Sequence, residues 1–345
     1  MIRIILSFVL SLHIITLSPY GFCGNKPKEE WSKEKLALAM LYADEIGSSA
    51  VIVLHKGALV QEWGDTGLKI RTASVRKSLL SALYGAGIDR GLIDITLTLE
   101  QLDIDDRPPV LTQAEKQATV EQLLKARSGV YHVSSAETDK MKAMRPKRGS
   151  FKPDEHWYYN NWDFNVLGTI FERQTNIPLD QAFTEWIAKP LGMQDFIKDD
   201  IQLLWTDQSL HPYSVFWMTA RDLARFGQLF LQKGLWQGKQ LLSEDWVTTS
   251  TFAHSTIQNG GYGYMWWIRP DGSYYAAGYH GQYVLILPKE EVVIVNMVFS
   301  GTPGFDCMPD EIVKELRPFL NPVSHREFID LVEKILAAGP EHIRW

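Results

Sequence analysis

Ser74 and Lys77 are the residues whose types and spacing first indicate chemistry in this chain. They belong to the run Ser74-Val75-Arg76-Lys77, where a β-rich segment passes into an apolar segment with helical periodicity. Residues three positions apart share one face of a helix, so the Lys77 amine can reach the Ser74 hydroxyl. A desolvated lysine has a lowered pKa and can accept the serine proton, which activates the serine as a nucleophile. The pair therefore indicates a covalent acyl intermediate on Ser74.

The S-x-x-K pattern is not specific by itself, because it occurs a second time at 32–35. We interpret Ser32 as the N-cap of a surface helix. The copy at Ser74 differs because Arg76 and Lys77 oppose the preference of a helix N-terminus for negative charge. Such violations of local propensity cluster at functional sites. On these residues alone, one alternative stays open: Ser74 caps a helix and the Lys77 side chain extends to solvent.

A second segment combines aromatic and polar residues between positions 153 and 161 and is followed by a helical pattern containing Gly168. It holds two overlapping pairs of tyrosine and asparagine, Tyr158 with Asn160 and Tyr159 with Asn161. A phenol can donate or accept a proton when cationic neighbours lower its pKa. The structural alternatives are a packing aromatic for the tyrosine and a loop-organising amide for the asparagine.

A third segment is the turn Gly278-Tyr279-His280-Gly281-Gln282, which leads into an apolar run at 283–287. Glycines at both ends of a short turn permit tight backbone geometry. Backbone N–H groups in such a turn can stabilise the oxyanion of a tetrahedral intermediate. A glycine-rich turn alone is only a turn, so this assignment depends on the other two segments.

Together, the three segments resemble the S-x-x-K, Y-x-N and K-T-G motifs of the penicillin-recognising serine hydrolases of the class C β-lactamase type. That superfamily includes 6-aminohexanoate-dimer hydrolases and related esterases. The resemblance extends over residues 32–320, and further matching segments are 126–130, 218–227 and 261–267. It selects the pair Tyr159 and Asn161, because Trp157 then fills the family's aromatic position and Gly168 its helical glycine.

The resemblance implies a role for each site residue. Ser74 is the nucleophile, Lys77 its activating partner, and Tyr159 shares the proton transfer. The backbone N–H groups of Ser74 and Tyr279 form the oxyanion hole. The substrate-binding residues are then Asn161, Gly278 and His280, although a hydrogen bond that holds the strand is the simpler role for His280.

One departure from the family pattern bears on the substrate. With Gly278 as the glycine of K-T-G, Ala276 stands where the family has a lysine. That lysine would place a cation beside the carboxylate of a β-lactam or of a peptide C-terminus. Its absence favours a hydrolase of esters or linear amides. The alternatives are a class C-type β-lactamase or D-alanyl-D-alanine carboxypeptidase, and a non-catalytic binding or sensor module. The intact catalytic residues argue against the binding module.

The elements that must position these residues follow from the hydrophobic periodicity. Helices are predicted at 32–46, 74–86, 120–126, 162–174, 179–187, 219–232 and 326–338, and strands at 50–54, 58–63, 274–277, 283–287 and 292–298. Strands at both ends with helices between them predict an α+β fold, in which one sheet carries a helical insertion. The resemblance implies an antiparallel β-sheet flanked by terminal helices. We therefore divide the chain into a sheet domain, 25–73 with 237–345, and a mainly helical domain, 74–236.

The first 24 residues are predicted to be a signal peptide, because Arg3 precedes an apolar stretch, 4–17, that is short for a membrane span. The protein is then expected to be periplasmic or secreted, with no stable membrane span once the leader is removed. Lipidation at Cys23 is an alternative, disfavoured by the bulky Phe22. Cys307 is the second of two cysteines in the chain, so no disulfide framework is implied.

Composition narrows the remaining function classes. A net charge of −6 over 345 residues, with no basic tract longer than 145–148, argues against a nucleic-acid partner. No G-x-S-x-G elbow is present, which disfavours an α/β-hydrolase. The 9 histidines lack the spacing of a zinc hydrolase, and no spacing suggests a metal or an organic cofactor. The expected partner is a small ester, amide or peptide-like substrate.

Overall fold

A computed structural model describes residues 30–258, 260–299 and 322–343. The predicted leader, Cys23 and Cys307 lie outside these residues. Helices account for 36% and strands for 19% of the structure, arranged around an antiparallel sheet. The α+β fold predicted from the sequence, with an antiparallel sheet flanked by terminal helices, is confirmed.

The main sheet has eight strands, and every neighbouring pair is antiparallel. Their order across the sheet is β2 (Ala58–Gly64), β1 (Ala50–His55), β13 (Val292–Met297), β12 (Gln282–Leu287), β11 (Tyr274–Gly278), β10 (Trp267–Ile268), β9 (Gly260–Tyr262) and β8 (Ser255–Ile257). The three central strands β1, β13 and β12 are buried at every position. Their runs of Val, Ile and Leu suit a sheet covered on both faces. The pairing of β1 with β13 joins the two ends of the chain, as the sequence predicts.

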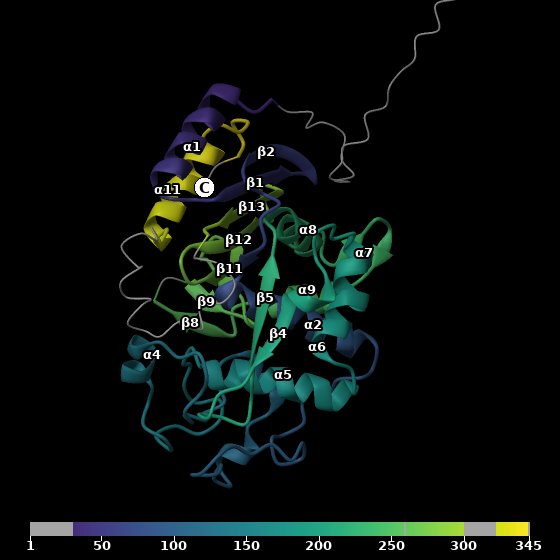
Figure 1. Ribbon diagram of the computed structural model, residues 1–345, viewed down its shortest axis with the longest axis vertical. Coiled ribbons are helices and arrows are strands. Elements are labelled where there is room, and N and C mark those ends of the chain that lie inside the picture. The colour runs from purple at the N-terminus through teal and green to yellow at the C-terminus, as the bar shows by residue number, and fades with distance from the viewer. Residues whose placement is uncertain (1–29, 259, 300–321, 344–345) are drawn as a thin grey trace, which may run out of the picture.

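Two terminal helices cover one face of this sheet, α1 (Lys33–Glu45) and α11 (His325–Leu336), and they lie side by side in Figure 1. Ser32 is the N-cap of α1, because its hydroxyl accepts a hydrogen bond from the Lys35 N–H at 3.3 Å. The second S-x-x-K is therefore a helix cap, as predicted. The Ser32 N–H donates to the Ala338 carbonyl at 2.8 Å, which ties the two helices together.

The opposite face packs on α8 (Ala220–Leu231), which contacts β1, β12 and β13. A Cβ on Gly227 would lie 2.6 Å from a Val293 methyl, so α8 rests directly on the strands. This helix comes from the segment 74–236 that we assigned to the helical domain. The same apolar core continues into the helical part of the molecule, below the sheet in Figure 1.

The helical part contains two long helices, α2 (Arg76–Asp89) and α5 (Asn161–Thr175), and the short helix α3 (Val120–Leu124). Helix α2 lies in the core, because 12 of its residues are buried. The shorter elements are α4 (Asp139–Met144), α6 (Leu179–Phe183), a π-helical turn (Thr184–Ala188), α7 (Lys189–Leu191), α9 (Glu244–Ser250) and the hairpin β6 (Leu235–Trp236) with β7 (Lys239–Gln240). The sequence did not predict a three-stranded sheet in this region, in the order β3 (Ile70–Arg71), β5 (Tyr213–Met218) and β4 (Ile201–Leu204). Its strand β3 leads directly into the segment that carries Ser74.

Candidate active site

Ser74 lies in a short 3₁₀ turn, η1 (Ala73–Val75), between β3 and the α-helix α2. The predicted helix from Ser74 therefore begins at Arg76. Ala73 has a φ of +47°, a left-handed conformation that is costly for a residue with a Cβ. Strained backbone of this kind is kept where the surrounding structure requires it, often at functional sites. Here it turns the chain sharply from strand to helix and leaves the Ser74 side chain partly exposed.

Lys77 donates a hydrogen bond to the Ser74 hydroxyl over 2.8 Å, the contact that the spacing predicts. The side chain is buried, and no carboxylate pairs with it among the residues described. Burial lowers the pKa of Lys77 well below its ordinary value, and the charge of Arg76 lowers this pKa further. The amine lies 4.9 Å from the Tyr159 ring centre and 5.0 Å from that of Phe164, contacts that favour the ammonium form.

These opposing effects on Lys77 differ in size. A cation over a desolvated aromatic face gains about 2 kcal/mol. A buried ammonium without a counter-ion loses several kcal/mol of hydration. Desolvation therefore prevails and favours the neutral amine, whose lone pair can accept the Ser74 proton.

Arg76 is a second buried basic residue in the first turn of α2. Its guanidinium donates to the Asn165 side-chain oxygen at 3.0 Å and to the Ser214 hydroxyl at 3.3 Å. Burial lowers the pKa of Arg76 to about 10, so it stays charged at neutral pH. Its contacts are to neutral groups, so its charge acts on Lys77 and Tyr159 without compensation by a hydrogen-bonded carboxylate.

Tyr159 is the tyrosine that the structure brings to Ser74. Burial raises the pKa of Tyr159 to about 12, while a side-chain hydrogen bond with Ser74 and the charge of Arg76 act in the opposite direction. Its phenol therefore keeps its proton at neutral pH. Tyr158 points elsewhere, because its hydroxyl donates to the Met141 carbonyl at 2.8 Å.

The loop that carries Tyr159 is held by backbone contacts to the segment after α3. The Asp154 N–H donates to the Arg127 carbonyl at 2.8 Å, and the Tyr158 N–H to the Ala126 carbonyl at 3.0 Å. At Gly129, with a φ of +71°, a Cβ would lie 2.8 Å from the Lys152 backbone, so only glycine fits this close approach. Residues 126–129 thus position the loop.

Asn160 and Asn161 divide between structure and site. Asn160 is the N-cap of α5, since its side-chain oxygen accepts from the Trp162 N–H, and its amide donates to the Val130 carbonyl at 2.6 Å. The Asn161 amide donates to the Ala136 carbonyl at 2.6 Å, but its buried side-chain oxygen has no hydrogen-bond partner. A buried acceptor without a donor is costly, so this oxygen is available to a substrate N–H or O–H.

Gly278 ends β11 directly beside the nucleophile turn. A Cβ at this position would lie 2.4 Å from the Thr72 carbonyl oxygen and 3.2 Å from the Ala73 Cβ. Glycine is therefore required for β11 to approach η1, the turn that carries Ser74, and Tyr279 is the residue that follows. The Tyr279 side chain is 53% exposed. The structure thus brings Ser74, Gly278 and the start of the predicted oxyanion turn together.

His280 has a φ of +68° and shapes this turn. Its carbonyl accepts a hydrogen bond from the Val323 N–H at 3.2 Å, and its ring packs edge-on against Tyr279. Gln282 fixes the end of the turn, since its side-chain amide donates to the Val298 carbonyl at 2.7 Å. These contacts fit a structural role for His280.

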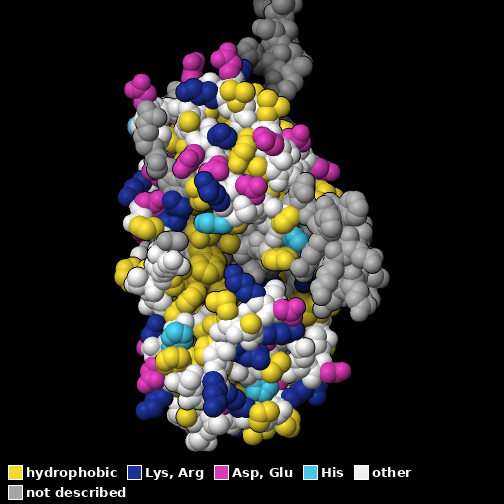
Figure 2. Space-filling model, turned by 90° about the vertical axis from the view of Figure 1, so that its left-hand side faces the viewer, with side chains coloured by type: hydrophobic (Ala, Val, Ile, Leu, Met, Phe, Trp, Pro, Cys, Tyr) yellow, Lys and Arg dark blue, Asp and Glu magenta, His cyan; other side chains and the backbone are white. Residues whose placement is uncertain are grey.

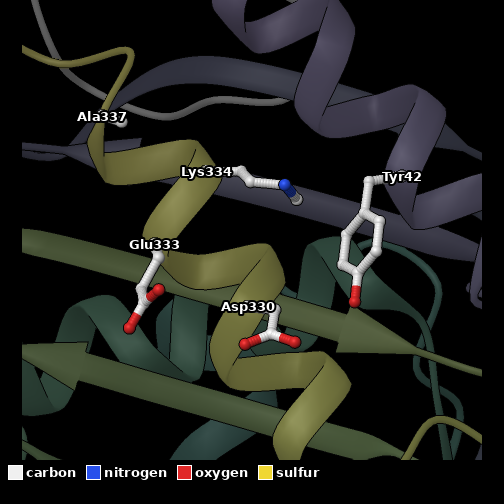
Figure 3. Close-up of a pocket in the computed structure, with 5 residues that line it drawn as sticks. All are labelled: Tyr42, Asp330, Glu333, Lys334 and Ala337. Carbon is white, nitrogen blue, oxygen red and sulfur yellow. The ribbon is translucent and has the colours of Figure 1, made fainter.

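Figure 2 shows a hydrophobic hollow near the middle of one face of the molecule. Strands β8, β9 and β11 lie at about the same level in Figure 1, toward the side that Figure 2 views. A separate depression lies between α1 and α11, where Lys334 sits over the Tyr42 ring at 4.9 Å and Asp330 and Glu333 flank it (Figure 3). It contains none of the predicted site residues.

Within the described ranges, no group of three or more His, Cys, Asp or Glu residues could hold a metal ion. No helix in these ranges is long and apolar enough to cross a membrane.

Sequence reasoning missed the side chains that surround the catalytic pair. Phe164 faces Lys77, while Asn165 and Ser214 hold Arg76. One signal was present, because Asn161 and Asn165 are four positions apart on one buried face of α5, where an amphipathic helix would carry apolar residues. Ser214 had no such signal, since it reaches Arg76 only through the unpredicted β3–β5 pairing.

Comparisons with known proteins agree with this geometry. The 6-aminohexanoate-dimer hydrolase of Paenarthrobacter ureafaciens is 25% identical over 294 residues, which are 74% of this chain and 73% of that protein. A family VIII carboxylesterase structure superposes with a TM-score of 0.63 at 15% identity, over 88% of this chain and 97% of that one. A penicillin-binding protein from Bacillus halodurans does so with a TM-score of 0.60 at 14% identity, over 81% and 99% of the two chains.

The two superposed structures share their fold with this chain, which confirms the predicted fold of the β-lactamase/transpeptidase type. The similarity in sequence extends well beyond the three motifs. The family model described as Beta-lactamase matches residues 39–313, which include Ser74, Lys77, Tyr159 and the turn at Gly278. Over most of its length, therefore, this chain belongs to the beta-lactamase family.

Proposed function

We propose that this protein is a serine hydrolase that cleaves esters or linear amides through an acyl-enzyme on Ser74. The observation that carries the proposal is the 2.8 Å hydrogen bond from the buried Lys77 amine to the Ser74 hydroxyl, with Tyr159 beside it. A nucleophile, a base and an adjacent proton donor are the groups that acyl transfer requires.

The shifted pKa values assign the proton transfers. Lys77 is the base, because its lowered pKa leaves it neutral, and it takes the proton as Ser74 attacks the carbonyl carbon. Tyr159 keeps its proton at neutral pH, so it can give this proton to the leaving alcohol or amine and take in its place the proton that Lys77 removed from Ser74. Water then attacks the acyl-enzyme, the proton passes back to Ser74, and the acid is released. The backbone N–H groups of Ser74 and Tyr279 hold the oxyanion, each worth about 3–4 kcal/mol of barrier.

The substrate preference rests on Ala276. It is buried, at 1% exposure, at the position that corresponds to the family lysine. An alanine offers no charge to a substrate carboxylate, so β-lactams and peptide C-termini lose that electrostatic anchor. The similarity to a protein named 6-aminohexanoate-dimer hydrolase, a hydrolase of an amino-acid dimer, supports an amide as one substrate class.

A turnover panel tests this proposal. The wild-type protein and Ser74→Ala are compared on short-chain nitrophenyl esters, linear oligoamides and a chromogenic cephalosporin. We expect ester or amide turnover in the wild type, background rates in Ser74→Ala, and little cephalosporin hydrolysis. Equal rates in both proteins would refute the nucleophile. Efficient cephalosporin hydrolysis would refute the substrate preference and leave the mechanism intact.

A further inference from the structure

Four aromatic rings form a row that begins at Tyr159 and leads away from Ser74. Tyr159 stacks on Trp267 with 5.4 Å between ring centres, Trp267 on Tyr275 with 6.4 Å, and Tyr275 on His325 with 5.5 Å. The angles between successive ring planes are 24°, 17° and 25°, so the rings are nearly parallel throughout. We call these four residues the aromatic row.

The aromatic row is built from three elements and ends at the surface. Trp267 on β10 and Tyr275 on β11 are directly paired residues of antiparallel strands, which places their side chains on one face of the sheet. Tyr159 comes from the loop before α5, and His325 is the first residue of α11. The first three side chains are partly exposed and His325 is exposed. Each of the four residues therefore has some surface exposed to solvent, and the exposure is greatest at His325.

Trp267 is partly exposed, whereas the adjacent Trp266 is not. Trp266 is fully buried and packs on Phe226 and Phe230, as core residues do. Trp267 instead contacts Tyr159, Trp157 and Tyr262, on the side of the site. The hydrophobic hollow of Figure 2 is on the side of the molecule toward which β9, β11 and α11 lie in Figure 1.

The charges around the aromatic row favour an uncharged ligand. Next to the row, β11 carries Ala276 and Ala277 before Gly278. Arg269 lies close enough to the far end to lower the pKa of both Tyr275 and His325, but its guanidinium is paired with Asp271 at 3.3 Å. The charge of Arg76 acts on the Tyr159 end of the row, whereas the rings of Trp267, Tyr275 and His325 gain most from an apolar or aromatic group, by burial and by stacking.

We propose that the aromatic row is a substrate subsite, which binds an uncharged aryl or long alkyl group attached to the scissile ester or amide. This inference rests on the proposed function, because it places that group beside Tyr159 while Ser74 attacks the carbonyl. The aromatic row then determines specificity, and the preferred substrates carry a bulky apolar group with no carboxylate.

The test compares kcat/KM for benzyl acetate and for ethyl phenylacetate with that for ethyl acetate, by titration of the acid released. Either aryl ester divided by ethyl acetate gives a selectivity ratio, in which the intrinsic reactivity of the esters cancels between variants. Removing one ring from an apolar subsite should lower this ratio about tenfold. We expect that loss in Tyr275→Ala and Trp267→Ala for at least one of the two aryl esters.

Two controls separate the aromatic row from general damage. Tyr275→Phe keeps the ring and should keep the wild-type ratio. Phe252→Ala removes a 64% exposed ring whose printed ring contact is with His254, outside the aromatic row, and should also keep it. A selectivity ratio within twofold of wild type for both aryl esters in both alanine variants would overturn the inference.

A binding measurement keeps the inference separate from the proposed function. Calorimetric titration of Ser74→Ala with benzyl acetate reports binding without turnover, and adding Tyr275→Ala should weaken it about tenfold. If the wild type hydrolyses no ester or amide, the proposed function fails, and this titration alone decides the subsite. Equal affinity in the single and double variants would overturn the subsite even if Ser74 is a nucleophile.

Discussion

At the scale of single residues, the reactivity of Ser74 depends on a pair of buried basic residues with different roles. Lys77 contacts the serine hydroxyl, and desolvation favours the neutral form of its amine. Arg76 faces away, toward Asn165 and Ser214, and keeps its charge. That charge lowers the pKa of Lys77 and of Tyr159 alike, because an ammonium is disfavoured and a phenolate is favoured beside a guanidinium. Arg76 is therefore a positioning and electrostatic residue rather than a catalytic one.

This role predicts a shift in the pH dependence of acylation. Neutral Lys77 is the active form, so the rate rises with pH through the pKa of Lys77. Arg76→Gln removes the charge and raises that pKa, which moves the rising limb of the kcat/KM profile to higher pH. Arg76→Lys is the matched control, because it keeps a cation and should keep the limb close to wild type. A limb that stays in place in Arg76→Gln would show that Arg76 is only structural.

At the scale of elements, the site depends on how closely β11 approaches the nucleophile turn. Gly278 sits against the Thr72 carbonyl and Ala73, and the predicted oxyanion donor Tyr279 follows it. The contact is with backbone, which cannot rotate away as a side chain can. Any side chain at position 278 must therefore separate β11 from η1.

Gly278→Ala should accordingly lower kcat, by about 10²-fold or more, the cost of losing one oxyanion donor. The steady-state kinetics of the most active ester from the panel measure this effect. Gly168→Ala is the control. Gly168 lies in α5, and a Cβ there would make only an ordinary van der Waals contact, at 3.5 Å, with a Leu179 methyl of α6. If both variants kept wild-type kcat, the oxyanion turn would lie elsewhere.

Some of these elements could be predicted from the sequence and others could not. Helices α8 and α11 were predictable because their apolar periodicity is strong, and α1 because Ser32 marks its start. The central strands were predictable as runs of Val, Ile and Leu. The short strands β3, β4 and β8–β10 were not, because strands of two to four residues are defined by distant partners. Ser74, Lys77 and Tyr159 were nominated by motif order. The aromatic row was not, because a sheet register and the start of α11 bring its members together.

At the scale of the whole molecule, the two chain ends close the sheet. Helices α1 and α11 bury one face of it, and the Tyr283 side chain of β12 projects into that layer. Its ring stacks on Phe328 of α11 with 4.0 Å between centres and 7° between planes. Strand β12 begins with Gln282, directly after the oxyanion turn, so this packing also supports the site from behind.

Phe328→Ala should therefore lower the free energy of unfolding by about 3–5 kcal/mol, the usual cost of removing a buried phenylalanine. Phe328 is 1% exposed, so little relaxation can fill the space. Chemical denaturation measures the loss, and Phe252→Ala, at an exposed position, should change stability by less than about 0.5 kcal/mol. A similar small change for Phe328→Ala would mean that α11 contributes little to the stability of the sheet.

The central claim is that Ser74 becomes acylated. Its most direct test is mass spectrometry of the intact protein after treatment with a serine-reactive aryl phosphonate. We expect one adduct per wild-type chain, mapped to the peptide that contains Ser74, with no adduct in Ser74→Ala and slow labelling in Lys77→Ala. Equal labelling of the wild type and Ser74→Ala, or an adduct on another serine, would contradict it.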